Sequence, residues 1–289
     1  MKKNGKIFTI LVALLLMLSL SATSLAVTFT DAHGNEIVLD DTLEAYSSVA
    51  LFGADNVARM GETNLGDLWT DALRWFAVSG RINNYYDEDD IAAGNTGVTV
   101  EADYIVALWN GGNIRADIPE GKFGAEELAL VLPYPNSAAV VYMTGAQLAE
   151  VLEAASQGLP YSEEAAATCA SFMQVSGLCY TIDTTKPYDA GEAYGDNWFK
   201  ANTVSRVTIT EVNGQPFDAG ATYAVVTSNA NFNGMDSSYV FVDAVAANEA
   251  STITSGVVRE IVWMYIDEVL ENVVGDGYET AQGRISIIE

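Results

Sequence analysis

The sequence predicts an α+β fold in which a mixed β-sheet is flanked by helices. Short apolar runs typical of buried strands recur along the chain, and the segment 64–79 instead carries its apolar residues at helical spacing. The strands and helices are interspersed without a regular βαβ rhythm, which favours a mixed sheet over a parallel one. We see no internal repeat.

Residues 1–26 have the pattern of an export signal. Three lysines precede an apolar run from Ile7 to Leu20, and Ser24-Leu25-Ala26 supplies the small residues that signal peptidase recognises. The apolar run is shorter than the ~20 residues that a membrane-spanning helix needs. We therefore expect cleavage before Val27, an extracellular, cell-envelope or periplasmic location, and no stable membrane anchor.

The chain after the signal divides into an extension at 27–58 and a domain at 59–289. Alternating residues on both sides of the turn at 31–35 predict a hairpin at 27–43. Thr144 and Gln147 have the spacing of a capping box, which predicts a helix from there to about Ser156. The other expected elements are strands at 104–109, 137–143, 172–175, 178–183, 206–212, 223–227 and 285–288, a tight turn at Asn213-Gly214 between two of them, and a long helix at about 255–271.

The protein is strongly acidic. It carries 39 Asp and Glu residues against 13 Lys and Arg, a net charge of −26, and three of its lysines lie in the export signal. Such a surface repels nucleic acid polymers and anionic lipid. A site for a small nucleotide must therefore be a local cluster of arginine side chains.

Cysteine and histidine are scarce. Cys169 and Cys179 are the two cysteines, and export makes a disulfide between them possible, with two separate buried thiols as an equally weighted alternative. His33 is the single histidine, and it lies in the predicted turn of the hairpin.

A glycine-rich turn with a following arginine suggests a ligand site. Asn110-Gly111-Gly112 directly follows a predicted strand, so backbone N–H groups there can approach a ligand closely. Arg115 offers a planar fork of donors suited to phosphate or carboxylate. The alternative is a tight turn in which Arg115 pairs with Asp117.

Several segments in order resemble the C-terminal, substrate-binding domain of the 5′-nucleotidase family. They are residues 59–68 (RMGETNLGDL), 110–115 (NGGNIR), 130–134 (LVLPY), 143–148 (MTGAQL) and 172–178 (FMQVSGL), with a looser match at 229–236 (NANFNGMD). The matching segments span residues 59–236. The resemblance implies the fold of that domain and a nucleotide, nucleoside or nucleotide-sugar ligand.

The resemblance also implies roles for single residues. Arg59 and Arg115 would face the anionic part of the substrate, and Asp236 would accept hydrogen bonds from the ribose hydroxyls. Tyr134 would stack on a ring. Asn110, Gly111 and Gly112 would form the floor of the site, whereas Asn64 would order the start of a helix.

The sequence departs from the family where a second aromatic ring would complete the stacking site. That position is Ala230, which cannot stack, although Phe232 lies two residues further on. The family's Gly-Gly-Asp is also altered to Gly234-Met235-Asp236. These differences weaken the prediction of nucleobase specificity.

Hydrolysis in this family belongs to an N-terminal domain with two metal ions held by several histidines and aspartates. A chain with one histidine cannot build such a site, so we expect no catalytic residue, no metal and no cofactor in this chain, and no catalysis by it alone. We expect an exported nucleotide- or nucleoside-binding domain. The alternatives are a split or truncated phosphatase that acts with a metallophosphoesterase chain, and a surface interaction module that has lost ligand binding.

Overall fold

The computed structural model describes residues 27–30, 36–39, 44–54, 56–86, 88–92, 94, 97–275 and 277–289. The predicted export signal and His33 lie outside the described residues. Among those that are described, no helix combines the length and the apolar character that crossing a bilayer requires.

A five-stranded mixed sheet forms the centre of the domain, which confirms the predicted fold class. Its strand order is β14-β6-β13-β4-β7. The pair β13 and β4 is parallel, and the other neighbouring pairs are antiparallel. The strands are β4 (Ile105–Asn110), β6 (Ser137–Thr144), β7 (Met173–Ser176), β13 (Thr222–Ser228) and β14 (Thr252–Val257).

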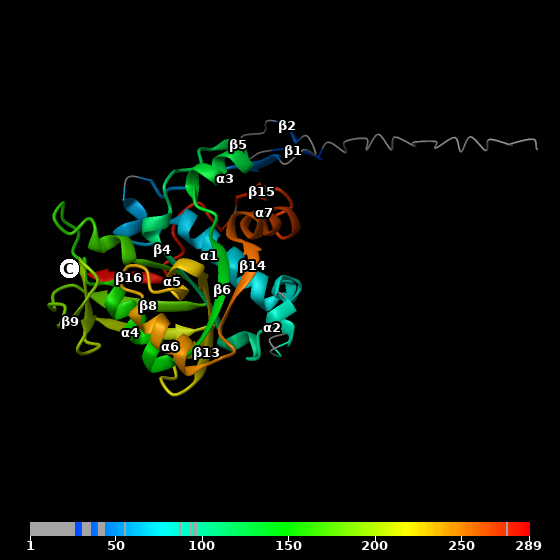
Figure 1. Cartoon of the computed structure of the whole chain (residues 1–289). Helices are drawn as coiled ribbons and strands as arrows, with labels where there is room; N and C mark the ends of the chain where they lie inside the picture. The colour runs from blue at the N-terminus through cyan, green and yellow to red at the C-terminus, as the bar shows by residue number, and fades with distance from the viewer. Residues whose placement is uncertain are drawn as a thin grey trace, which may run out of the picture.

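Helices cover both faces of this sheet (Figure 1). Along β4, Ile105 and Trp109 belong to the core cluster that contains α1 and α7, whereas Val106 belongs to the cluster that contains α4 and α6. This alternation follows from the two-residue period of a strand and buries both faces. The helices are α1 (Asn64–Val78), α4 (Gly145–Ala155), α6 (Tyr239–Ala247) and α7 (Val258–Glu268).

Smaller sheets surround the central one. The predicted hairpin is confirmed: β1 (Val27–Thr30) pairs antiparallel with β2 (Glu36–Leu39). A four-stranded sheet has the order β12-β11-β8-β16, and its last pair is parallel. The remaining elements are β3 (Glu44–Ser47), β5 (Gly121–Gly124), β8 (Leu178–Asp183), β9 (Ala190–Tyr194), β10 (Trp198–Ala201), β11 (Val207–Val212), β12 (Gln215–Pro216), β15 (Val273–Val274), β16 (Ile285–Ile288), and the helices α2 (Glu88–Ala92), α3 (Ala125–Val131) and α5 (Asn229–Phe232).

Two helix starts were predicted and are confirmed. The Thr144 hydroxyl accepts from Gln147 N (3.2 Å), and the Gln147 side chain accepts from Thr144 N (2.9 Å), which completes the capping box of α4. At α1, the Asn64 amide donates to Ala50 O (2.9 Å) and Tyr278 O (2.8 Å). Asn64 therefore orders the helix start, as expected.

Two of the expected elements were wrong. The long helix at about 255–271 is shorter, because residues 252–257 form β14 at the sheet edge and α7 begins only at Val258. The Asn213-Gly214 turn leads from β11 to the two-residue β12, and not to β13, which lies in the central sheet. In both places sheet pairing, a long-range interaction, decides what a local pattern leaves open.

Residues 44–58 pack as part of the domain that we expected to begin at Arg59. β3 pairs with β5, and Leu51 forms an antiparallel bridge with Ile118. Ala45 and Ala58 are fully buried in the same core cluster as α1. This packing places the segment just before Arg59 against the end of the central sheet.

Candidate functional site

A short turn carries Arg59 to the end of the central sheet. Residues 57–59 form one turn of 3₁₀-helix, preceded by Asn56 in the left-handed conformation (φ 70°). The Arg59 side chain is half-buried, and its guanidinium donates to Ala166 O at 3.3 Å. The Arg59 side chain therefore connects its own turn to the loop at 157–171.

The buried side chain of Gln174 on β7 fixes this turn. Its amide nitrogen donates to Ala58 O (2.9 Å) and Gly61 O (2.7 Å), on both sides of Arg59. Its amide oxygen accepts from Thr63 N (3.1 Å). Sequence reasoning missed Gln174 as a positioning residue, although it stands inside the family-like segment at 172–178.

The two glycines after β4 are enclosed by the chain's own backbone, and their place at the floor of a ligand site stays a prediction. A Cβ on Gly111 would lie 1.8 Å from Ala58 O, and one on Gly112 would lie 2.6 Å from Ala170 O. The Gly111 N–H donates to Phe172 O at 2.7 Å, so it is not available to a ligand. The glycines are needed because the chain's own backbone passes there, and they hold the Arg59 turn in place.

Asn110 is also a buried supporting residue. Its side chain is 1% exposed, and its oxygen accepts from the Asn113 amide at 2.9 Å. This bond ties the end of β4 to the turn that precedes Arg115. The place of Asn110 at the floor of a ligand site stays a prediction.

Arg115 leaves this turn toward the exposed ring of Tyr134. Its guanidinium carbon lies 5.8 Å from the ring centroid, within the range of a cation–π contact. The alternative pairing with Asp117 is wrong, because the Asp117 carboxylate instead accepts from Gly53 N (2.7 Å) and Ala54 N (2.8 Å). Among the described residues, no hydrogen bond or ion pair involves the Arg115 guanidinium.

Asp236 reaches the same place from the loop between α5 and α6. It has a left-handed backbone (φ 56°), a conformation that few residues other than glycine adopt. The Tyr194 hydroxyl donates to Gly234 O (2.8 Å) and the Asn231 amide to Thr227 Oγ1 (2.8 Å), so bonds from two directions hold this loop.

The charges of these residues act on one another. Burial and then repulsion from Arg115 lower the pKa of Arg59, while attraction to Asp236 opposes them. Burial raises the pKa of Asp236, although both arginines draw it down. The structure thus brings Arg59, Arg115 and Asp236 together, with Tyr134 beside Arg115. Their roles in ligand binding stay predictions.

The part of Phe232 as a second ring of the stacking site stays a prediction. Ala230 is buried, and Phe232 packs against the core cluster of α4 and α6. Met235 is 49% exposed in the altered loop. Tyr161, in the loop at 157–171, raises the pKa of Arg59 by its charge and so lies on the Arg59 side of the site. Tyr161 lies outside the family-like segments, so the sequence did not identify it as a site residue.

The cysteines do not meet. Cys169 is buried beside Gly158, whose carbonyl oxygen accepts from its thiol at 2.9 Å, and burial raises the pKa of that thiol to about 11. Cys179 lies on β8, where its thiol is 3.6 Å from the Glu211 carboxylate. Of the two alternatives left open, the structure has the separate thiols.

No metal site is visible in the described ranges, where no three or more His, Cys, Asp and Glu side chains gather as metal ligands do. What the described residues offer is a place where two guanidinium groups can bind an anion, with a carboxylate and a phenol ring beside them. Two arginines suit a phosphate because each presents parallel N–H donors. A carboxylate can accept from both hydroxyls of a vicinal diol.

Comparison with known proteins identifies the family of this domain. Residues 43–243 match the family model for the 5′-nucleotidase C-terminal domain. The trifunctional nucleotide phosphoesterase protein YfkN of Bacillus subtilis (strain 168) is 31% identical over 202 residues, which are 69% of this chain and 11% of YfkN.

Two solved structures are similar over most of this chain. The 5′-nucleotidase precursor of Thermus thermophilus is 28% identical with a TM-score of 0.60, over 86% of this chain and 40% of that one. The NAD nucleotidase of Haemophilus influenzae has 14% identity and a TM-score of 0.56, over 85% of this chain and 38% of that one, and shows the fold alone. The family match covers more than half of this sequence, and its domain belongs to the 5′-nucleotidase C-terminal domain family.

Proposed function

We propose that this protein is an exported domain that binds a nucleotide, a nucleoside or a nucleotide sugar. The observation that carries the proposal is the convergence of Arg59 and Arg115 beside Asp236. The positive charges of the two arginines repel each other, although the 39 acidic residues of the chain could pair with an arginine elsewhere. A bound anion would offset this repulsion.

Each side chain has a separate task in the proposed complex. Arg59 and Arg115 bind the phosphate or another anionic group. Tyr134, which is 46% exposed, offers its ring face to a base or other ring. Asp236 accepts from a vicinal diol such as that of ribose, and its desolvated carboxylate gains donors when a diol arrives.

We further propose that the chain does not hydrolyse its ligand alone. It spans 11% of YfkN and 40% of the Thermus 5′-nucleotidase precursor, and its single histidine is too few for a site that holds two metal ions. A metallophosphoesterase chain acting with this domain would supply the metal ions. The second candidate, an interaction module without a ligand, is favoured by the absence of an aromatic ring at Ala230.

Calorimetric titration of the mature protein with AMP and adenosine tests the proposal. Arg59→Gln and Arg115→Gln should each weaken AMP by about 1.5–3 kcal/mol, the scale of a charge-assisted hydrogen bond. Adenosine should change little in these variants, whereas Tyr134→Ala should weaken both ligands by ~1–3 kcal/mol.

Arg81→Gln is the matched control, because Arg81 pairs with Glu268 and contacts Trp75, away from Tyr134. It should leave both affinities unchanged. If neither AMP, adenosine nor a nucleotide sugar binds the native protein, the ligand-binding proposal fails and the interaction module becomes the better account.

A further inference from the structure

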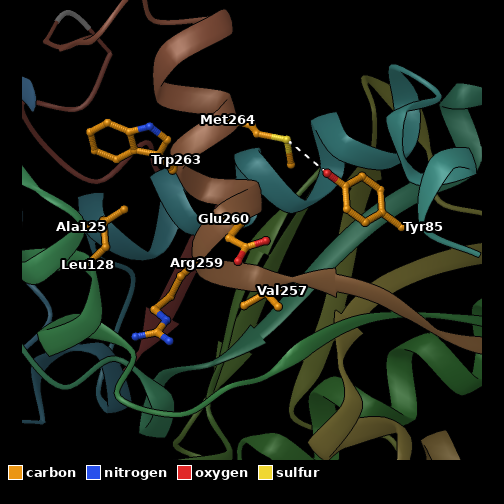
Figure 2. A pocket seen from close by; sticks show the side chains of 8 residues that line it. All are labelled: Tyr85, Ala125, Leu128, Val257, Arg259, Glu260, Trp263 and Met264. Carbon is orange, nitrogen blue, oxygen red and sulfur yellow. Dashed lines mark hydrogen bonds between the residues drawn. The ribbon is translucent and has the colours of Figure 1, made fainter. Parts of the chain in front are cut away.

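A cavity lies along the outer side of α7. Its volume is about 490 Å³, within the size range of small-molecule sites. On α7, the side chains of Val258, Ile261 and Val262 are buried in the core. Other residues of the same helix line the cavity: Arg259, Glu260, Trp263 and Met264. α3 and Tyr85 form the two sides (Figure 2).

The walls are largely apolar and held in place. Ala125 and Leu128 come from α3, and Met264 comes from α7. Tyr85 donates through its hydroxyl to the Met264 sulfur at 3.6 Å, and its ring meets that of Phe76 edge-on at 5.1 Å. The half-buried indole of Trp263 completes the lining and offers a surface on which another ring can pack.

One charged group in the cavity has no partner among the residues that the structure describes. Arg259 is half-buried, and within the described part of the chain no hydrogen bond or ion pair involves its guanidinium. Glu260 also lines the cavity, but it is exposed, and Figure 2 shows the two side chains pointing away from each other. A partly desolvated arginine gains most from an anion that can accept two hydrogen bonds.

We propose that this cavity binds a small aromatic anion, with its ring against Trp263 and its anionic group on Arg259. The site shares no residue with the Arg59 and Arg115 cluster. A backbone hydrogen bond from Val258 N to Asn136 O, at 2.9 Å, connects the start of α7 to the segment after Tyr134. The inference is independent of the proposed nucleotide site.

Fluorescence titration with anilinonaphthalene sulfonate, compared with neutral phenylnaphthylamine, tests the proposal. The native protein should bind one sulfonate per chain, more tightly than the neutral amine. Arg259→Gln should weaken the sulfonate by about tenfold or more, the loss of a charge-assisted hydrogen bond. The neutral probe should change by less than about twofold, because its ring contacts remain.

Three further variants locate the probe. Ala125→Trp places a large ring at an exposed position of the cavity wall and should remove binding of both probes. Leu130→Trp, on the same helix at a position that is 65% exposed and outside the cavity, is the control and should change neither. Circular dichroism and thermal unfolding check that each variant is folded.

Arg59→Gln, the third variant, separates this site from the proposed nucleotide site. Sulfonate binding should be unchanged in this variant, and its loss there would overturn the proposal by placing the probe in the other cluster. The proposal is equally overturned if no sulfonate binds or if Arg259→Gln has no effect. Failure of AMP to bind would leave the cavity proposal standing.

Discussion

Two arginine environments in this protein differ in what the protein itself supplies. Arg284 is held at the N-terminal half of α1 by Asp71 Oδ2 (2.8 Å) and Val175 O (2.8 Å), with Asp67 Oδ1 at 3.7 Å. Arg59 has one hydrogen bond among the described residues, to Ala166 O, and a second arginine beside it. Arg284 thus has several acceptors from the protein, whereas Arg59 has one among the described residues. We call the surroundings of Arg59, Arg115 and Asp236 the open environment.

The pKa directions express the same contrast. Burial lowers the pKa of both guanidinium groups, but bonding and attraction to Asp71 overcome it at Arg284, whose pKa is raised. At Arg59 the pKa stays lowered, because Arg115 adds repulsion. The difference teaches that an arginine serving the fold is surrounded by acceptors, whereas one left short of acceptors is a candidate for binding a ligand.

The largest expected effect is the loss of Arg284. Arg284→Met should lower the free energy of unfolding by about 3–5 kcal/mol, because it leaves the Asp71 carboxylate without its largely buried ion-pair partner. Arg59→Gln should cost less than about 1 kcal/mol. Urea unfolding at neutral pH measures both, and equal losses would show that the two environments do not differ.

A smaller effect is expected from Gln174, which connects the site to the fold. Gln174→Leu removes the donors of Ala58 O and Gly61 O and should cost about 1–3 kcal/mol of stability, the scale of unpaired buried polar groups. It should also weaken AMP, since Arg59 lies between these two carbonyls. Unchanged AMP affinity in a folded variant would remove Gln174 as a positioning residue.

The pH dependence of stability should come from Asp67 in the Arg284 environment. Burial raises its pKa to about 8, although Arg284 draws it down, and Glu62 raises it further. The folded state therefore holds a proton that the unfolded state loses near pH 4, so this contribution to stability declines as pH rises toward 8.

Asp67→Asn mimics the protonated carboxyl and tests this sign. The variant should be more stable than the native protein near pH 8, and its advantage should shrink as the pH falls toward 4. Thermal unfolding across this range measures the difference. A native protein that gains stability relative to the variant as pH rises would show that Asp67 is ionised when folded.

The smallest stability effect is expected at Asp236 in the open environment. Burial raises its pKa, so ionisation near pH 7 opposes folding. Asp236→Asn should raise the melting temperature slightly at pH 7, and the gain should vanish in acid, where the native carboxyl is protonated as well. It should weaken adenosine binding. A lower melting temperature together with unchanged adenosine binding would contradict both assignments.

The sequence by itself determined the elements whose signals are local. The apolar spacing at 64–79 and the Thr144–Gln147 pair predicted α1 and α4, and the ordered motifs over residues 59–236 predicted the family. These signals work because capping and helical periodicity act over three or four residues. The motifs also named Arg59, Arg115, Tyr134 and Asp236, which the structure brings together.

Only the tertiary structure decided what depends on distant partners. Residues 255–257, where we expected the start of a helix, belong to the strand β14 because β6 offers an edge with which it pairs. Gly111 is required because Ala58 O passes where its Cβ would be, and Gln174 matters because its side chain reaches carbonyls more than a hundred positions away. Such roles are set by contacts between segments that the chain brings together on folding, and a local pattern does not record them.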